Sequence, residues 1–416
     1  MARSFDIPNY YKSSLVSVIK QARRVSDSRK KDFSPSVLDL GRLRFKLARH
    51  FGFCFGVENA IEIAYRAIAE NPGKRVFLLG EMIHNPHVNN DLKSKGVEFL
   101  LASDGAELVP FENLSAEDIV IVPAFGTTVE LFEKLAGLGV NPYSYNTTCP
   151  FVEKVWNRAA DLGKRGFTVV VHGKHTHEET RATFSHARLS APTIVVLNLE
   201  EAKVLARYIR REIPPQQFGV DFPGRFSCEF DPQRDLKRIG VVNQTTMLAT
   251  ETREIAEHLR DAMQTTYPNE DLNYHFADTR DTLCYATYEN QEAVHGLIQS
   301  GADLAVVVGG YNSSNTSHLV ELCEKKMPSF HIKDAGEIID ARTIRHLDFR
   351  SGKVNISKDW LPLGAQSLDI VLTAGASCPD ALVDEVLTRI AELCGLAHCI
   401  PQAMIPFRND EQTING

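Results

Sequence analysis

Short runs of aliphatic and β-branched residues recur along the chain and are separated by longer amphipathic stretches. An apolar run of four or five residues is typical of a buried strand, and a longer amphipathic stretch is typical of a helix. Their alternation predicts an α/β fold whose sheets are mostly parallel. The runs that predict strands are residues 76–79, 119–122, 168–171, 194–197, 239–242, 304–308 and 370–372.

Five of these predicted strands end alike, with a cluster of glycine or hydroxyl residues before a predicted helix start. Ligands of parallel sheets bind beyond the carboxyl ends of the strands, where backbone N–H groups and helix amino termini attract anions. For any one cluster the alternative is ordinary N-capping by serine or threonine. Because the pattern recurs five times, we favour a pocket for a phosphate or diphosphate. The clusters are residues 123–128, 172–180, 243–246, 309–316 and 373–379.

The length and charge of the chain exclude several classes of protein. A chain of 416 residues exceeds one compact core, so we expect two or three domains. The net charge of −7 argues against a nucleic-acid binder, which carries a basic surface. No apolar run approaches the ~18 residues of a membrane helix, so we expect no membrane partner. Residues 1–31 have no signal-peptide core and become basic and polar toward their end, so we expect a frayed or loosely docked extension.

Three of the eight cysteines lie in predicted loops that are far apart in the sequence, namely Cys54, Cys149 and Cys284. No two cysteines form a C-x-x-C pair, which argues against zinc ribbons and thioredoxin-like sites. Three thiolates from three segments suggest a cubane iron–sulfur cluster in which one iron has no protein ligand and can bind substrate. The alternative for a single cysteine is a small buried hydrophobic residue, as we expect for Cys323 on a helical apolar stripe.

Histidine and carboxylate side chains near the same strand ends are candidates for binding and proton transfer. Glu179, in the sequence His-Glu-Glu-Thr after the strand at 168–171, is a candidate proton donor. His84 and His177 also follow predicted strands, and as cations they would bind phosphate oxygens. A zinc site at the histidines of the Glu179 loop is a weaker alternative, because their spacing does not place them on one helical face and no H-E-x-x-H motif occurs.

Taken together and in order, the motifs around these residues resemble those of the 4-hydroxy-3-methylbut-2-enyl diphosphate reductase family, which catalyses the last step of the methylerythritol phosphate route to isoprenoids. The resemblance covers residues 45–404. The motifs that carry it are Gly-Phe-Cys54-Phe-Gly-Val, Gly-Glu-Met-Ile-His84-Asn, Asn-Thr-Thr-Cys149-Pro, His177-Glu-Glu179-Thr, Asn-Gln-Thr245-Thr246, Leu-Cys284-Tyr-Ala-Thr, Asn-Ser313-Ser314-Asn315-Thr and Ala-Gly-Ala-Ser377-Cys-Pro.

The resemblance implies an iron–sulfur oxidoreductase with three α/β domains arranged around a central [4Fe–4S] cluster. Cys54, Cys149 and Cys284 would hold the cluster, whose fourth iron meets the hydroxyl of (E)-4-hydroxy-3-methylbut-2-enyl diphosphate. Glu179 would supply the proton as water leaves. Two electrons from a ferredoxin or flavodoxin would then yield isopentenyl and dimethylallyl diphosphate. The implied substrate-binding residues are His84, His177, Thr245, Thr246, Ser313, Ser314, Asn315 and Ser377.

One position departs from many bacterial members of the family. Where these carry a further diphosphate-binding histidine, this chain has Phe125. The phenylalanine, the long N-terminal extension and the His-Glu-Glu-Thr loop together resemble the plant and cyanobacterial branch. Thr127, or the backbone N–H groups at the helix start that follows, are candidates to replace the missing histidine.

The family fold implies a division of the chain into an N-terminal extension, three α/β domains and a C-terminal segment that covers the cleft. Residues 213–235, rich in proline and phenylalanine, are expected to form a long surface loop. The cysteine usage predicts a reducing, cytoplasmic location, or the plastid stroma if the extension is a transit segment. The implied ranges are residues 1–44, 45–148, 149–281, 282–390 and 391–416.

Two alternatives to the reductase remain open from the sequence. A non-redox iron–sulfur hydro-lyase acting on a phosphorylated substrate would use the open iron only as a Lewis acid and would need no reductant. An iron–sulfur sensor without turnover would not need Glu179 or the Ser313-Ser314-Asn315 motif, so their presence favours an enzyme.

Overall fold

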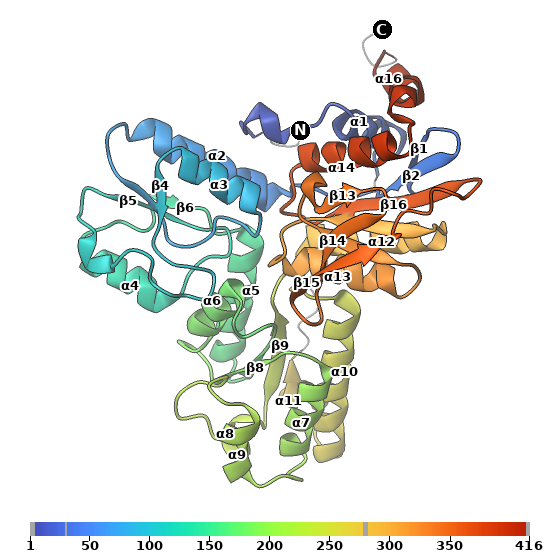
Figure 1. The fold of residues 1–416 in the computed structure, drawn as a ribbon. Coiled ribbons are helices and arrows are strands. Elements are labelled where there is room, and N and C mark those ends of the chain that lie inside the picture. Colours follow the sequence, from blue (N-terminus) through green and yellow to red (C-terminus); the bar gives the residue numbers. More distant parts are fainter. Residues whose placement is uncertain (1–4, 30, 278–281, 413–416) are drawn as a thin grey trace. The chain divides into compact units, whose positions relative to one another are not determined.

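The computed structural model describes residues 5–29, 31–277 and 282–412, with the backbone alone for residues 409–412. The chain divides into two compact units, of which unit 1 comprises residues 1–58, 84–88 and 285–416, and unit 2 comprises residues 59–83 and 89–284. Unit 2 holds two sheets that are parallel throughout, and unit 1 holds one mixed sheet (Figure 1). The predicted α/β fold with mostly parallel sheets is therefore confirmed.

The sheet of unit 1 has eight strands in the order β1–β2–β16–β11–β12–β14–β13, with β15 also paired to β14. The four strands β2, β16, β11 and β12 are parallel, and β1, β13, β14 and β15 add antiparallel pairs. Every residue of β11, Leu-Ala-Val-Val-Val, is buried, as expected of a strand covered on both faces. The bounds are β1 (Ser36–Asp39), β2 (Leu43–Leu47), β11 (Leu304–Val308), β12 (Ser329–Ile332), β13 (Ile338–Asp340), β14 (Thr343–Asp348), β15 (Lys353–Lys358) and β16 (Leu368–Ala374).

The helices of unit 1 turn apolar stripes toward its core. In α14 the buried residues Leu382, Val386 and Ile390 recur every four positions, the spacing of one helical face. Cys323 is fully buried on α13, which confirms the expectation that it packs as a hydrophobic residue. The bounds are η1 (Asn9–Tyr11), α1 (Val16–Ser26), α12 (Tyr285–Gln299), α13 (Ser314–Glu324), η4 (Ala335–Glu337), α14 (Asp380–Leu393), η5 (Ala397–Cys399), α15 (Ile400–Ala403) and α16 (Ile405–Gln412).

The expectation of a frayed or loosely docked N-terminal extension is wrong for residues 5–29. Helix α1 buries Val16 and Ile19 and contacts α14 and α16 within unit 1 (Figure 1). The backbone N–H groups of residues 14–16 donate to the carboxylate of Asp384, at 2.9–3.0 Å. The polar sequence of this segment suggested a solvated terminus. The carboxylate that anchors it belongs to Asp384, near the other end of the chain, and the local sequence does not reveal that contact.

Unit 2 contains the sheets β4–β3–β5–β6 and β10–β9–β7–β8. In the second sheet, β7 lies between β8 and β9, and all of its residues are buried. Residues of α7 and α10 form one apolar cluster with this sheet, and residues of α5 and α6 form a second. The helices that cover this sheet therefore form two separate apolar cores with it, as in other parallel sheets. The bounds are β3 (Val76–Leu78), β4 (Val97–Phe99), β5 (Ile119–Val122), β6 (Tyr145–Asn146), β7 (Thr168–His172), β8 (Thr193–Val196), β9 (Ile239–Asn243) and β10 (Phe276–Ala277).

The remaining helices belong to unit 2, except that α2 and α3 each include residues of both units. Their bounds are α2 (Phe55–Glu70), α3 (Pro86–Ser94), η2 (Phe111–Asn113), α4 (Val129–Gly137), α5 (Pro150–Lys164), α6 (Glu178–Ala187), α7 (Leu199–Ile209), η3 (Pro215–Gln217), α8 (Phe218–Asp221), α9 (Pro232–Asp235), α10 (Ala249–Thr266) and α11 (Leu272–His275). Among the described residues, no helix is both long and apolar enough to cross a bilayer.

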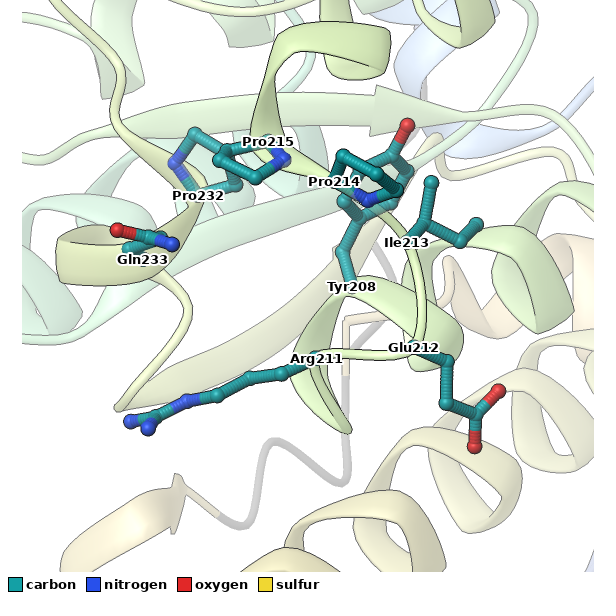
Figure 2. Close-up of a pocket in the computed structure, with 8 residues that line it drawn as sticks. All are labelled: Tyr208, Arg211, Glu212, Ile213, Pro214, Pro215, Pro232 and Gln233. Atoms are coloured by element: carbon teal, nitrogen blue, oxygen red, sulfur yellow. The ribbon is translucent and has the colours of Figure 1, made fainter.

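The predicted surface loop at residues 213–235 is held by its own aromatic residues. Phe218 and Phe222 are buried in the core beneath it, and short helices interrupt it. Figure 2 shows a hollow that this segment lines, with the side chains of Arg211 and Gln233 at its border. None of the residues that line this hollow is a predicted site residue.

Every run predicted as a strand is a strand in the structure, as β3, β5, β7, β8, β9, β11 and β16. The proposed division into three α/β domains between an N-terminal extension and a C-terminal segment stays a prediction. Its boundary at Asp281 lies outside the described residues.

Candidate active site

The predicted site residues follow the carboxyl ends of strands, where parallel sheets bind ligands. In unit 2, Cys149 follows β6, Glu179 follows β7 and Thr245 follows β9. In unit 1, Ser313 follows β11 and Ser377 follows β16. The strand-end clusters chosen from the sequence are therefore placed as predicted within each unit.

Each of the three predicted cluster cysteines directly precedes a helix. Cys54 precedes α2, Cys149 is the N-cap of α5, and Cys284 precedes α12. All three side chains are of intermediate exposure. The partial positive charge of a helix amino terminus stabilises a thiolate, which is the form of cysteine that binds metal. This shared position was not noticed in the sequence, although the proline after Cys149 is a typical first residue of a helix.

Unit 2 brings Cys149, Cys284 and Glu179 within electrostatic reach of one another. Burial, together with the negative charges of Cys284 and Glu179, raises the pKa of the Cys149 thiol to about 12. The two thiols therefore oppose each other's ionisation as long as no cation lies between them. A sulfur-binding metal centre removes that repulsion, so this pair of side chains fits the iron–sulfur group that the resemblance implies.

Glu179 is held by two hydrogen bonds from one residue. It is 1% exposed in the first turn of α6, where its Oε1 accepts from the backbone N–H of Thr245 (2.5 Å) and its Oε2 from the Thr245 hydroxyl (2.8 Å). Both contacts, and the helix amino terminus, stabilise the carboxylate form. The carbonyl of Thr245 accepts the N–H of Cys284 (3.4 Å), so one threonine contacts both the acid and a cysteine.

A buried glutamine that the sequence analysis missed joins the Glu179 and Thr245 loops. The Oε1 of Gln244 accepts from the Thr180 hydroxyl (3.0 Å) and from the N–H of Lys174 (3.2 Å). Its Nε2 donates to the hydroxyl of Thr246 (2.7 Å), a predicted substrate-binding residue. No local sequence signal marks Gln244, because its partners on the Glu179 loop lie 64–70 residues away.

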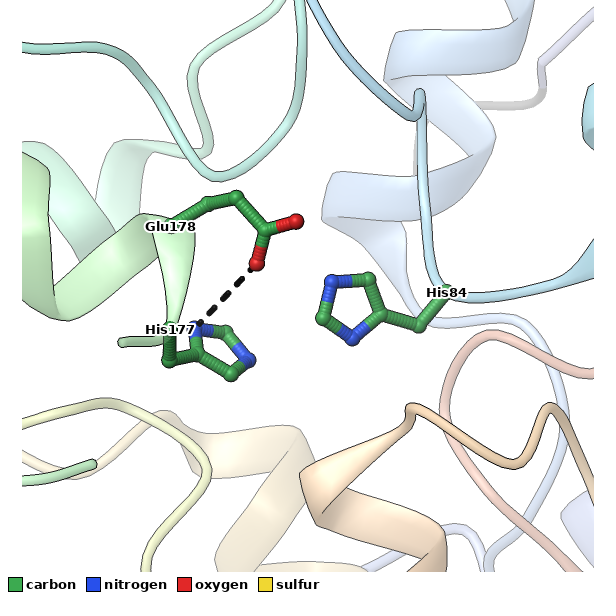
Figure 3. Close-up of side chains that lie close together, drawn as sticks. All are labelled: His84, His177 and Glu178. Atoms are coloured by element: carbon green, nitrogen blue, oxygen red, sulfur yellow. Dashed lines mark ion pairs between the residues drawn. The ribbon is translucent and has the colours of Figure 1, made fainter. Parts of the chain in front are cut away.

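His177 is the N-cap of α6, and its expected role as a phosphate-binding residue stays a prediction. Its Nδ1 accepts the N–H of Glu179 (3.2 Å), so in this geometry the ring is neutral and Nε2 carries the proton. Glu178 Oε2 lies 4.0 Å from the same Nδ1 (Figure 3). The ring of Phe125 meets the His177 ring edge to face, at 5.5 Å between centroids. Phe125 thus fixes the orientation of a histidine instead of supplying one.

Five of the predicted diphosphate ligands gather in unit 1. His84 Nδ1 donates to the carbonyl of Asn312 (2.6 Å), and the Ser377 hydroxyl donates to the carbonyl of His84 (3.3 Å). Ser313 is the N-cap of α13, as the capping alternative predicted, and its Oγ accepts the N–H of Thr316 (3.3 Å). Ser314 and Asn315 are the first two residues of that helix, where N–H groups are available to an anion.

The side-chain amide nitrogen of Asn315, Nδ2, is a donor for which the described residues provide no acceptor. Its Oδ1 accepts the N–H of Ala376 (2.9 Å), which fixes the side chain. Its Nδ2 is buried and has no hydrogen-bond partner among the described residues. A buried donor without a partner is costly, so its presence at a helix start favours a site for an acceptor such as a phosphate oxygen.

Comparison with known sequences finds a family profile and named relatives that match most of the chain. Residues 45–391 match the sequence profile of the family described as LytB protein. A relative from Gloeobacter violaceus, named 4-hydroxy-3-methylbut-2-enyl diphosphate reductase, is 43% identical over 360 residues, which cover 86% of this chain and 84% of the relative. A relative of the same name from Prochlorococcus marinus strain AS9601 is 38% identical over 392 residues, covering 92% and 96%. The predicted likeness to cyanobacterial members is confirmed.

Comparison with solved structures agrees with the sequence relatives. One structure, described as (E)-4-hydroxy-3-methyl-but-2-enyl diphosphate reductase, the terminal enzyme of the non-mevalonate pathway, matches with a TM-score of 0.50 and 25% identity, covering 84% of this chain and 99% of that one. The E-1-hydroxy-2-methyl-but-2-enyl-4-diphosphate reductase of Plasmodium falciparum matches with a TM-score of 0.59 and 20% identity, covering 83% and 87%. At that identity the second match supports the fold alone.

Proposed function

This chain belongs to the LytB family of 4-hydroxy-3-methylbut-2-enyl diphosphate reductases, and we propose a role for each of its site residues in that reaction. The chain is a reductase of the non-mevalonate pathway, in which the enzyme of this name is terminal. The observation that carries the assignment of roles is the contact set of Thr245, which joins Glu179 to the loop of Cys284 in unit 2.

The three cysteines are the proposed ligands of a [4Fe–4S] cluster. Support comes from the shared position of the three cysteines before helices, and from the charge effect of Cys284 on Cys149. Cys54 is assigned by its matching motif in the family. A bound cluster supplies the electrons with which the substrate hydroxyl is removed.

Glu179 is the proposed proton source, acting through Thr245. The form of Glu179 that acts as the acid carries its proton at Oε2, the oxygen that as a carboxylate accepts the Thr245 hydroxyl. Oε2–H then donates to Thr245 Oγ1, and the original Thr245 hydroxyl proton moves on to the leaving oxygen of the substrate. Both side chains are buried, so bulk water does not compete for the proton during this transfer.

The polar groups of unit 1 and His177 are the proposed diphosphate ligands. Because His84 Nδ1–H is committed to the Asn312 carbonyl, its Nε2 donates to a phosphate oxygen only as the imidazolium. His177 donates through Nε2 in its neutral form. Asn315 Nδ2 and the first N–H groups of α13 add neutral donors, and the hydroxyls of Ser313, Ser314 and Ser377 complete the proposed diphosphate ligands. Thr245, at the hydroxymethyl end, and Thr246 are proposed to bind the substrate as well.

The electron donor and the location extend this proposal. A ferredoxin or flavodoxin is the proposed donor, as the resemblance implies, and isopentenyl and dimethylallyl diphosphate are the proposed products. Cytoplasm or plastid stroma is the proposed compartment, because a chain of 416 residues with eight cysteines is far larger and poorer in cysteine than a typical secreted disulfide scaffold. Thr127, which is buried beside Phe125, is proposed to take the place of the third histidine.

Anaerobic purification followed by electron paramagnetic resonance tests the cluster and its ligands. We expect about four iron atoms per chain and a signal that changes when the diphosphate substrate is added. Cys149→Ser should lose most of the iron. Cys228→Ser, at an exposed cysteine of the 213–235 loop, is the matched control and should keep it. A colourless, iron-free protein, or equal iron in both variants, contradicts the ligand assignment.

Two further measurements separate the reductase from its alternatives. Turnover should require a reductant, whereas a hydro-lyase turns over without one and a sensor does not turn over at all. The substrate alcohol without its diphosphate should bind orders of magnitude more weakly. Equal affinity for the two compounds would overturn the roles given to Asn315 and the other unit 1 ligands.

A further inference from the structure

The N-terminal segment, residues 5–29, is fixed at both ends of α1 to unit 1. Asp384 accepts three N–H groups at the start of α1. After its end, Asp27 accepts the guanidinium of Arg49, through its carbonyl (3.0 Å) and its carboxylate (3.3 Å). The helix is therefore held in one position on its unit.

One of those side chains, Lys20, contacts the Cys54 loop, defined as residues 51–55. Its Nζ donates to the carbonyl of Phe51 (2.7 Å) and to Oδ1 of Asp380 (2.6 Å), and lies 4.1 Å from the centre of the Phe51 ring. The side chains of Lys20 and Asp380 are each 19% exposed. A charged group this well covered, with three contacts in fixed directions, orients its neighbours more strongly than a surface ion pair does.

Gly52 lets the loop approach these groups closely. Its φ of +78° lies in the left-handed region that side chains rarely adopt. A Cβ at this position would lie 2.2 Å from Oδ1 of Asp380 and 2.8 Å from Nζ of Lys20. Gly52, the loop residue with the greatest backbone freedom, therefore lies next to Lys20 and two positions before Cys54.

Aromatic contacts continue the interface along the loop. Tyr11 meets Phe53 at 5.7 Å and Phe5 meets Phe55 at 5.0 Å between ring centroids, both edge to face. These rings of the loop, which flank Cys54 in the sequence, thus pack against the N-terminal segment. Edge-to-face pairs of this kind are individually modest and favour one geometry.

The loop is joined in turn to the residues that follow β16. The N–H of Cys54 donates to the carbonyl of Ala376 (3.2 Å), whose own N–H donates to Asn315 (2.9 Å). Asp380, the partner of Lys20, is the first residue of α14 in the same stretch. Lys20 therefore joins the Cys54 loop to the segment that follows β16, and the hydrogen bond from Cys54 to Ala376 connects the same two segments.

From these contacts we infer that Lys20 is a positioning residue, which holds the Cys54 loop against the start of α14 and so fixes where the Cys54 sulfur lies. The inference rests on the proposed function in one respect, that Cys54 is a cluster ligand. Without the ammonium group, the Phe51 carbonyl and the Asp380 carboxylate lose their common donor, and Gly52 is free to leave its left-handed conformation. Cys54 then samples several positions, and its hold on a metal loosens.

Hydrogen exchange of the cluster-free protein tests the positioning directly. In Lys20→Met, peptides that cover residues 51–55 should exchange about tenfold faster than in the wild type, as expected when a charged hydrogen bond is lost. Alkylation of Cys54, followed by mass spectrometry, should accelerate similarly relative to Cys149. Lys31→Met, at an exposed lysine of the same terminal region, is the matched control and should change neither rate.

Unchanged exchange and alkylation in Lys20→Met would overturn the inference, and so would equal acceleration in both variants. If Lys20→Met fails to fold, Lys20→Arg decides in its place. A guanidinium cannot reproduce the ammonium geometry, so a local acceleration at residues 51–55 is again expected, and its absence overturns the inference.

The assembled enzyme distinguishes this inference from the proposed function. In air, the visible absorbance of the cluster should decay several-fold faster in Lys20→Met than in Lys31→Met. Faster exchange without faster cluster decay would leave Lys20 as a positioning residue and remove Cys54 from the ligand set. Normal exchange with a normal cluster would keep the ligand and reject the role of Lys20.

Discussion

At the residue scale, Thr245 is the position on which the proposed chemistry depends most. Its N–H and hydroxyl both donate to Glu179, and its carbonyl accepts from Cys284. The backbone therefore fixes the carboxylate next to a cysteine loop, and the hydroxyl alone is available to pass a proton. Substitutions at Glu179 and Thr245 can separate these two roles.

Glu179→Gln should lower kcat by about 10²–10⁴-fold, because an amide cannot deliver the proton that the reaction needs. Iron content and the resonance spectrum should stay unchanged, since Glu179 is not a proposed ligand. Rates measured with an artificial reductant, beside iron analysis, check both statements. Turnover close to that of the wild type would remove Glu179 from the mechanism. Thr245→Ser, which keeps the hydroxyl, is the matched control and should retain most of the activity.

At the element scale, the sequence predicted what depends on local pattern and missed what depends on distant partners. All seven apolar runs are strands, because a buried parallel strand needs an unbroken apolar run. The strand β15 was not predicted, because five of its six residues are exposed and show no apolar face. Glu179 was chosen from its strand-end loop, and the three cysteines were chosen from loops that are far apart in the sequence. Gln244 and the anchor of α1 were not, because their partners lie at least 64 residues away.

Asp384→Asn tests whether α1 depends on its distant cap. The amide keeps one acceptor oxygen for the three N–H groups but loses the charge, so we expect a loss of about 1–2 kcal/mol in the free energy of unfolding. Limited proteolysis should also cut within residues 5–29 sooner. Glu385→Gln, at the exposed neighbour on α14, is the control and should leave both measurements unchanged. Equal behaviour of the two variants would show that apolar packing alone holds α1.

At the scale of the whole molecule, a buried histidine and a paired carboxylate contribute to the response to acid. Burial lowers the pKa of His331, in β12, to about 4, although its Nε2 donates to the carbonyl of Gly309. Burial raises the pKa of Glu130, but hydrogen bonds from Arg188 and Ser185 outweigh it and hold that pKa at about 2. Both groups bind protons more weakly when folded, so stability falls with falling pH. The histidine acts first, below about pH 6.5, and the carboxylate below about pH 4.5.

His331→Gln should flatten the upper part of this acid response. Between pH 7 and pH 4.5, the wild type should lose about 2 kcal/mol of unfolding free energy through His331, and the variant should not. Denaturant unfolding of the cluster-free protein at a series of pH values measures the difference. His398→Gln, at an exposed histidine, should follow the wild type. Parallel curves for wild type and His331→Gln would show that the histidine is not held neutral by the fold.

The parallel pairing of β2 with β16 has a consequence for biosynthesis. Their paired residues lie 325 positions apart, so β2 leaves the ribosome roughly 15 to 65 seconds before its partner. During that interval the whole of unit 2 is translated and can fold, while the apolar residues of β2 have not yet met their partner strand β16. Chaperone capacity during translation, more than the intrinsic stability of the finished protein, is then expected to govern the yield of folded chains.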